Sequence, residues 1–164
     1  MASESANLIV NGWTIFAHPL FLDELDNLIK KVAVLKNKDP LNYTKKNVSK
    51  KLAAISKLAF DVIPKDPDIA AYRQGTTLGR DHKHWFRAKF FQQYRLFFRF
   101  DSKSKIIVYV WVNDDKSKRA YGNKTDAYRM FEKMLNNGHP PDGWEELLKE
   151  AKSESDRLGK IVKK

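Results

Sequence analysis

Residues 85–99 read WFRAKFFQQYRLFFR, and this stretch decides the fold because its residues change character with a period of two. Such alternation is typical of β-strands whose two faces differ chemically. We predict strands over residues 85–91 and 94–100 with a turn between them. A third strand is predicted over residues 105–112, which are apolar on both faces as in a central strand. The three segments predict a compact antiparallel sheet.

Cations interrupt the aromatic residues of this stretch and raise a question of function. Arg87 and Lys89 are two positions apart and therefore point to one face of their strand, and Arg95 joins them if the two strands pair in the simplest register. Three like charges on one face repel each other unless an acidic neighbour or a bound anion offsets them. Trp85 and Phe97 on the same face offer rings on which unstacked bases could lie. From the residues alone, RNA or single-stranded DNA binding and cations at the edge of a core stay equally open.

The segments before and after the sheet have the three-and-four apolar spacing of amphipathic helices. We predict an antiparallel helical hairpin over residues 19–35 and 39–62, and a further helix over residues 125–137. Asp142 and Glu145 have the spacing of a capping box for a last helix. The predicted fold class is α+β, with an N-terminal helical hairpin, an antiparallel sheet of three to five strands, and C-terminal helices. We expect the helices to pack on one face of the sheet.

Length and composition indicate a folded globular protein of one domain. With 164 residues, of which 42% are hydrophobic, the chain is long enough to bury a core, and we take residues 1–164 as a single domain. The absence of cysteine excludes disulfides and thiolate chemistry. The longest apolar stretch, residues 106–112, is far shorter than the roughly 20 residues that a membrane-spanning helix needs. We therefore expect no membrane association and a cytoplasmic location.

The net charge of +11 is concentrated in one part of the sequence. Residues 80–124 hold 12 basic and four acidic residues. This excess indicates a surface for a polyanion such as nucleic acid, although a well-solvated basic surface has the same composition. Arg119, Tyr121 and Lys124 follow the last predicted strand on a short polar segment that could fold over the cationic face. A plain surface loop with a half-buried tyrosine is the alternative interpretation.

The histidines offer little metal chemistry. His82 and His84 could share a face, but no cysteine, second histidine pair or HExxH pattern accompanies them, so we predict no metal site. The sequence has no phosphate-binding glycine loop and no nucleophile elbow, which argues against nucleotide hydrolysis and serine catalysis. His139, between a glycine and two prolines, could be a general acid or base, or simply structural.

Four ordered blocks of sequence resemble those of a known family. They are NGWTIFAHPLF near the start, YRLFFRF in the predicted sheet, WVNDDKSKRAYGNKTDAY after it and GHPPDGWEEL near the end. Together they are similar to the YhaV toxins of PrlF–YhaV toxin–antitoxin pairs, which are grouped with the RelE-like ribonucleases. The resemblance implies a RelE-like fold and the toxin of a type II toxin–antitoxin system. Such a toxin is an endoribonuclease that cuts messenger RNA on the ribosome and stops translation and growth.

The resemblance also implies how the reaction proceeds. RelE-like enzymes use no metal or other cofactor, and the ribose 2′-hydroxyl attacks the adjacent phosphate, whose developing charge must be stabilised. By similarity, Arg87 and Arg95 clamp the phosphate, and Lys89 adds charge or transfers a proton. The further catalytic residues implied are Arg119, Tyr121 (or Tyr128 in its place) and His139. We also predict that Lys83, Trp85, Lys118 and Lys124 bind RNA.

Partners follow from the same resemblance. A PrlF-type antitoxin, which is a dimeric DNA-binding protein, would form a hetero-oligomer with the toxin, and operator DNA would be reached only through the antitoxin. The net charge of +11 favours an acidic segment in that partner. The main alternative is a basic module that binds messenger or ribosomal RNA without cutting it, and a second is a structural component of a protein complex.

Overall fold

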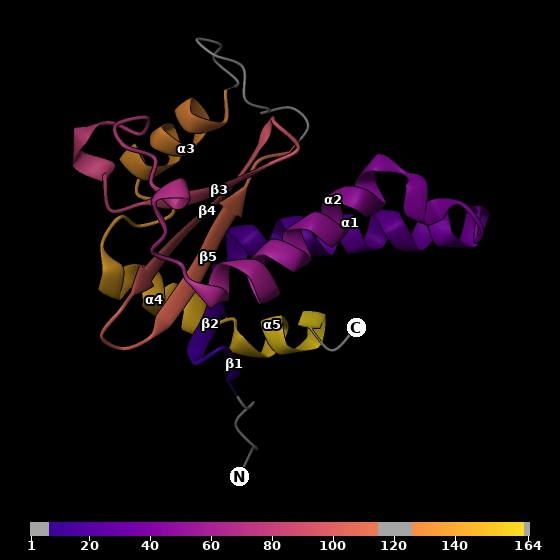
Figure 1. Cartoon of the computed structure of the whole chain (residues 1–164), viewed down its shortest axis with the longest axis horizontal. Helices are drawn as coiled ribbons and strands as arrows, with labels where there is room; N and C mark the ends of the chain where they lie inside the picture. The colour runs from indigo at the N-terminus through magenta and orange to yellow at the C-terminus, as the bar shows by residue number, and fades with distance from the viewer. Residues whose placement is uncertain (1–6, 115–125, 163–164) are drawn as a thin grey trace.

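The structure of the chain, a computed structural model, describes residues 7–114 and 126–162 (Figure 1). The strands are β1 (Leu8–Val10), β2 (Trp13–Ala17), β3 (Phe86–Phe90), β4 (Tyr94–Asp101) and β5 (Ile106–Val112). The helices are α1 (Pro19–Lys38), α2 (Asn47–Lys57), α3 (Ala127–Asn136), α4 (Trp144–Lys152) and α5 (Ser155–Val162). The α+β class is as predicted.

Within the described residues the strands form a sheet in the order β1-β2-β5-β4-β3. β1 pairs antiparallel with β2, and β4 pairs antiparallel with both β3 and β5. β2, however, runs parallel to β5. The expectation of a purely antiparallel sheet is therefore wrong. β5 is the central strand, as its two apolar faces predict.

β1 and β2 were not predicted from the sequence, because they contain only three and five residues. They are joined by a two-residue turn at Asn11 and Gly12, whose φ angles are 52° and 85°. An Asn-Gly pair with both residues at positive φ is the signature of a type I′ hairpin turn, so a signal for this hairpin was present. Because both strands precede α1, the described chain does not begin with helices.

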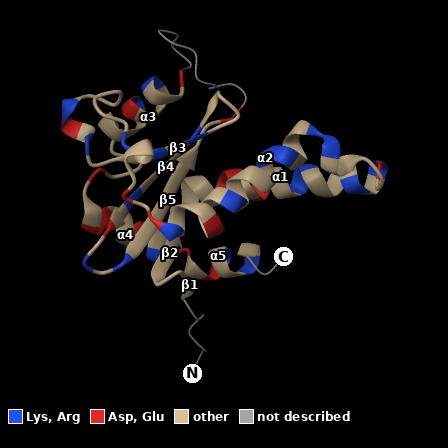
Figure 2. Cartoon of the chain, in the orientation of Figure 1, with Lys and Arg blue, Asp and Glu red and all other residues tan. Residues whose placement is uncertain are grey.

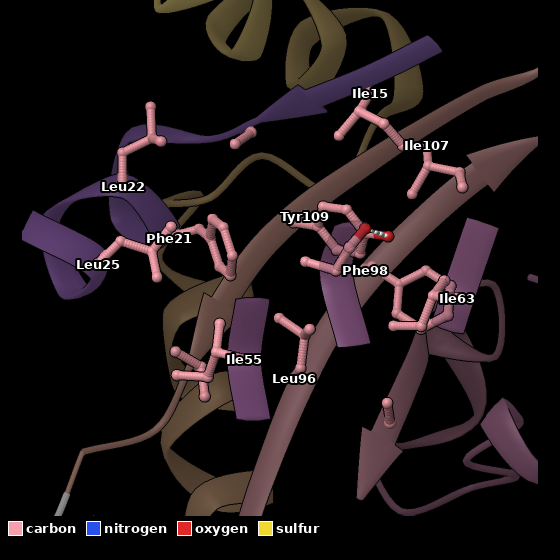
Figure 3. Packing of buried hydrophobic residues seen from close by; sticks show 14 of the residues in the cluster. Ile15, Phe21, Leu22, Leu25, Ile55, Ile63, Leu96, Phe98, Ile107 and Tyr109 are labelled. Carbon is pink, nitrogen blue, oxygen red and sulfur yellow. Dashed lines mark hydrogen bonds between the residues drawn. The ribbon is translucent and has the colours of Figure 1, made fainter. Parts of the chain in front are cut away.

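Helices cover both faces of the sheet, and the expectation that they cover one face is wrong. On one face, α1, α2 and α5 pack over a core that includes Phe98 and Tyr109, whose hydroxyl donates a hydrogen bond to the carbonyl of Ala59 (Figure 3). On the opposite face, α3 and α4 pack over Phe97 and Val108. The central strands are apolar on both sides, so each face needs its own cover.

α1 and α2 lie side by side and project away from the sheet (Figure 1). α2 begins at Asn47, later than predicted, because a 3-10 turn at Tyr43–Lys45 precedes it. Beyond α2 the backbone continues as a π-helical turn at Leu58–Val62. Lysines are frequent on the part of α1 and α2 that lies farthest from the sheet (Figure 2). Every helix of the described chain is too short or too polar to span a bilayer.

His18 is the N-cap of α1 and lies fully buried at the end of β2. Its Nδ1 accepts a hydrogen bond from the backbone N–H of Leu20 (3.2 Å), and its Nε2 lies 2.8 Å from Oε1 of Glu150 in α4. Burial lowers the pKa of His18 below the ordinary value of 6.5, and the interaction with Glu150 only partly opposes this shift. The imidazole therefore accepts a proton less readily in the folded chain than in the unfolded chain.

Acidification below about pH 6.5 is expected to lower the free energy of unfolding, because the unfolded chain then binds a proton at His18 that the folded chain does not. His18→Asn keeps an N-cap acceptor but removes the titrating group. The unfolding free energy of this variant should depend less on pH below about 6.5 than that of the parent chain. Urea unfolding at a series of pH values measures the difference, and parallel pH profiles would contradict the expectation.

Candidate active site

β3 and β4 place three cations on one face of the sheet. Lys89 lies directly opposite Arg95 across the two strands, and Arg87 lies two residues before Lys89 on β3. Their side chains therefore share a face, as the alternation of the sequence predicts. This is the face that α3 and α4 cover.

Two of these cations converge on the hydroxyl of Tyr128, which is near the start of α3. Nε of Arg87 donates to this hydroxyl at 2.7 Å, and Nε of Arg95 donates to it at 3.1 Å. Nη1 of Arg87 also donates to the carbonyl of Ala71 (2.8 Å), and Nη1 of Arg95 donates to the carbonyl of Gln92 (2.7 Å). These bonds fix the planes of both guanidinium groups.

Both arginines are buried, with 7% of Arg87 and 4% of Arg95 exposed. The surface predicted for a polyanion therefore does not hold these two side chains open to solvent, because Tyr128 and backbone carbonyls replace most of the water around them. Buried charged groups are normally paired with an opposite charge. Among the residues that the structure describes, no carboxylate forms an ion pair with either guanidinium. Their positive charge is thus not neutralised within this part of the chain.

The Nη2 groups of the two arginines are the atoms that could donate hydrogen bonds to a ligand. Within residues 7–114 and 126–162, neither Nη2 atom donates a hydrogen bond. The 7% of Arg87 and 4% of Arg95 that stay exposed leave part of each side chain in contact with solvent. Each Nη2 atom has two N–H groups to offer, and a guanidinium suits the oxygens of a phosphate.

Asn113, directly after β5, holds the connection between β3 and β4 in place. Its Oδ1 accepts a hydrogen bond from the backbone N–H of Arg95 (2.7 Å), and its Nδ2 donates to the carbonyl of Gln93 (3.0 Å). Its own carbonyl accepts a hydrogen bond from Nζ of Lys51, a buried lysine of α2 (2.9 Å). Sequence reasoning did not single out this residue. An asparagine at the end of a central strand is the signal that could have drawn attention to it.

Trp85 and Phe97 are completely buried, so neither ring can stack on a base, and that expectation is wrong. Phe97 stacks instead on Phe131 of α3, with the ring centroids 4.3 Å apart. Trp85 meets the ring of Phe131 edge to face (5.0 Å), and its Nε1 donates a hydrogen bond to Oδ1 of Asp142 (2.7 Å). These rings form the core beneath α3 and hold that helix in place.

The other two predicted lysines of this region differ in position. Lys89 is exposed beside Arg95 and stays close to the arginine pair. Lys83 lines a hollow together with Arg73 and Phe86, and Phe86 packs into the core on the opposite face of the sheet. The structure therefore does not bring Lys83 to the arginine pair.

His139 also lies apart from the arginine pair. It follows the end of α3, whereas Tyr128 is at the start of this ten-residue helix, and a helix of that length is about 15 Å long. Its ring is instead near that of His18, with the centroids 5.9 Å apart. The remaining predicted residues, Lys118, Arg119, Tyr121 and Lys124, lie outside the described residues.

A second polar cluster lies just before β3. Oδ1 of Asp142 accepts hydrogen bonds from Nδ1 of His82 (3.1 Å), Nε2 of His84 (2.8 Å) and Nε1 of Trp85 (2.7 Å). Burial raises the pKa of Asp142, but these hydrogen bonds outweigh it, so the net shift is downward. Asp142 is therefore not the helix cap predicted from the sequence, and the N-cap of α4 is Gly143. The cluster brings together three side chains whose ligand atoms could coordinate a metal ion, although the sequence analysis predicted no metal site.

The sequence around the arginine pair matches a described protein family. A family model described as "Toxin with endonuclease activity, of toxin-antitoxin system" matches residues 15–152. The chain belongs to the YhaV toxin family. It is 47% identical over 143 residues to the ribonuclease toxin YhaV of Escherichia coli strain K12, a match that covers 86% of this chain and 93% of that protein. The toxin YhaV of Escherichia coli O157:H7 matches to the same extent.

A solved structure is also similar to this YhaV family member. It is the toxin–antitoxin complex RelBE2 from Mycobacterium tuberculosis, which matches 66% of this chain and 95% of the solved chain. The TM-score is 0.40 and the sequence identity is 22%.

Membership of the YhaV family gives the class of activity. The chain is the toxin of a toxin–antitoxin system and has endonuclease activity, so it is an enzyme whose partner is an antitoxin. The two alternatives, a non-catalytic RNA-binding module and a structural component, are thereby set aside. The family match includes Arg87, Arg95, Asn113 and Tyr128.

Proposed function

We propose that this YhaV toxin is a metal-independent endoribonuclease that cuts messenger RNA on the ribosome, and that Arg87 and Arg95 bind the scissile phosphate. The observation that carries the proposal is the buried pair of guanidinium groups without a carboxylate partner among the described residues. A phosphodiester supplies the missing negative charge, and the two Nη2 groups can bond to its non-bridging oxygens. The Escherichia coli K12 relative is named a ribonuclease, which supports RNA as the substrate.

The proposed reaction starts with attack of a ribose 2′-hydroxyl on the adjacent phosphorus. The bond from phosphorus to the 5′-oxygen breaks, so the upstream fragment ends in a 2′,3′-cyclic phosphate and the downstream fragment begins with a 5′-hydroxyl. Negative charge grows on the non-bridging oxygens in the transition state. Guanidinium groups that Tyr128 already holds in place stabilise this charge without reorganisation during the reaction.

Other residues have supporting roles in the proposal. Lys89 is exposed beside Arg95 and adds positive charge along the path of the RNA, or transfers a proton. We assign no step to His139, which α3 separates from Tyr128, nor to the buried Trp85. Arg119 and Tyr121 are further proposed catalytic residues from the sequence resemblance, and Lys118 and Lys124 are further proposed RNA-binding residues.

The proposed partner is a PrlF-type antitoxin, a dimeric DNA-binding protein that forms a hetero-oligomer with the toxin and carries it to operator DNA. An acidic segment of that antitoxin would complement the net charge of +11. Because messenger RNA and ribosomes are the proposed targets, the toxin acts in the cytoplasm.

The ends of the RNA products test the proposed chemistry. Purified toxin is incubated with one messenger RNA, either free or on programmed ribosomes, and both new ends are characterised. We expect 5′-hydroxyl and 2′,3′-cyclic phosphate ends, produced only on ribosomes. Ends with 5′-phosphate and 3′-hydroxyl would reject the 2′-hydroxyl nucleophile, and equal cleavage of free RNA would reject ribosome dependence. A single 2′-deoxynucleotide at the cut site is the matched control, because it should block that cut alone.

A further inference from the structure

Two imidazoles and a carboxylate meet just before β3, outside the proposed active site. The atoms that could bind an ion are Nδ1 of His82, Nε2 of His84 and a carboxylate oxygen of Asp142, and they all lie within 4.8 Å of one another. We propose that these three side chains form a binding site for a divalent transition metal ion, with Zn²⁺ the ion that the donors fit best. The inference goes beyond the proposed function and does not depend on it.

The donor atoms suit zinc. Zn²⁺ binds imidazole nitrogen and carboxylate oxygen at about 2.0–2.2 Å and prefers four ligands in a tetrahedron, which places neighbouring ligand atoms about 3.4 Å apart. The Asp142 oxygen already lies 3.1 Å from the His82 nitrogen and 2.8 Å from the His84 nitrogen. The two imidazole nitrogens would therefore move slightly away from the Asp142 oxygen to make room for an ion, by shifts on the order of 1 Å or less. Mg²⁺ and Ca²⁺ prefer oxygen ligands and fit this set poorly.

The arrangement around Asp142 favours replacement of its hydrogen bonds by an ion. Three N–H groups converge on the single oxygen Oδ1. An ion would take the place of the two imidazole protons, whereas Nε1 of Trp85 would stay on the carboxylate and orient it. The side chains of His84 and Asp142 are 37% and 39% exposed, so an ion can enter from solvent and a water molecule can complete the tetrahedron.

The position of the cluster indicates a structural role for the ion. His82 and His84 lie on the segment that enters β3, whereas Asp142 lies between α3 and α4. A bound ion would tie these two segments together beside Trp85, which packs on Phe131 of α3. Because α3 carries Tyr128, the ion would stabilise the support of the arginine pair without contacting the RNA.

Metal titration of the purified full chain tests the site. Toxin treated with EDTA and freed of chelator is titrated with ZnCl2 in a calorimeter, and with CoCl2 while the visible absorption is recorded. We expect one ion per chain, Co²⁺ bands of tetrahedral coordination, and a rise in Tm of about 5 °C at a hundredfold excess of Zn²⁺ over Kd. Absence of binding by both ions at near-neutral pH would overturn the proposal.

Variants locate the binding. His84→Ala removes one ligand, and Asp142→Asn removes the charged ligand while leaving an oxygen acceptor for Trp85. Each should weaken Zn²⁺ binding by about 100-fold or more and abolish the Tm shift. His139→Ala is the matched control, because it removes an exposed histidine outside the cluster and should leave Zn²⁺ binding unchanged. Equal affinities in all three variants would show that the ion binds elsewhere and would overturn the assignment.

Discussion

Arg95→Met is expected to lower the rate of RNA cleavage by about 100- to 1,000-fold while the chain stays folded. Methionine keeps most of the unbranched stem that packs on β4, and replacement of a buried charge by an apolar side chain of similar size is often tolerated. What is lost is a preorganised positive charge at the phosphate. Arg87→Met should have an effect of the same size, because its guanidinium shares the Tyr128 hydroxyl with Arg95. Cleavage of messenger RNA on programmed ribosomes and relief of growth arrest are the two measurements.

Arg73→Met is the matched control for both substitutions. Arg73 is exposed, and its guanidinium pairs with Asp68. Its replacement should change neither the cleavage rate nor the Tm appreciably. The double variant of Arg87 and Arg95 should lose less activity than the product of the two single losses, because both groups act on one phosphate. Full toxicity of folded Arg87→Met and Arg95→Met proteins would refute the assignment of the site.

Phe131→Ala is expected to lower the free energy of unfolding by about 3–5 kcal/mol, which is among the largest effects of a single substitution. Its ring is completely buried and stacks on both Phe97 and Trp111, with centroid distances of 4.3 and 5.6 Å. Removal of the ring leaves a cavity between α3 and the sheet that rigid neighbouring rings cannot fill. Urea unfolding of the two proteins measures the difference.

The control for this substitution is Val34→Ala on α1, where the side chain is 51% exposed. It should change the unfolding free energy by less than about 0.5 kcal/mol. A loss below about 1 kcal/mol for Phe131→Ala would mean that α3 is not packed on the sheet as described. In that case the position of Tyr128, one turn earlier on the same helix, would also be in doubt.

The strands of the sheet could be predicted where apolar and polar residues alternate along the sequence. The short strands and the pairing between distant strands could not. Alternation over 85–100 gave β3 and β4 and placed Arg87, Lys89 and Arg95 on one face. β1 and β2 were not predicted, because strands of three and five residues are too short to show a periodic pattern. The turn at Asn11 and Gly12 nevertheless marked their position. The parallel pairing of β2 with β5 joins segments about 90 residues apart in the sequence, and no local pattern encodes such a contact.

The candidate site was predictable in its cations, and the family resemblance named Tyr128 only as an alternative to Tyr121. The alternation could not show that Arg87 and Arg95 are buried, because their burial depends on α3, which follows more than 30 residues later. For the same reason, the aromatic rings that suggested base stacking turned out to form core beneath α3. Asp142 had the spacing of a helix cap, yet it bonds to His82 and His84, which are 60 and 58 residues away. A carboxylate with several possible donors takes the partners that tertiary structure supplies.

Binding of the scissile phosphate by Arg87 and Arg95 is tested most directly by a structure of the toxin on a ribosome. The messenger RNA in that structure carries a 2′-O-methyl group at the cut site, which blocks the nucleophile. We expect the scissile phosphate to lie within about 3 Å of guanidinium nitrogens of both Arg87 and Arg95. A scissile phosphate bound elsewhere on the toxin, with both arginines still bonded only to Tyr128 and backbone carbonyls, would contradict it.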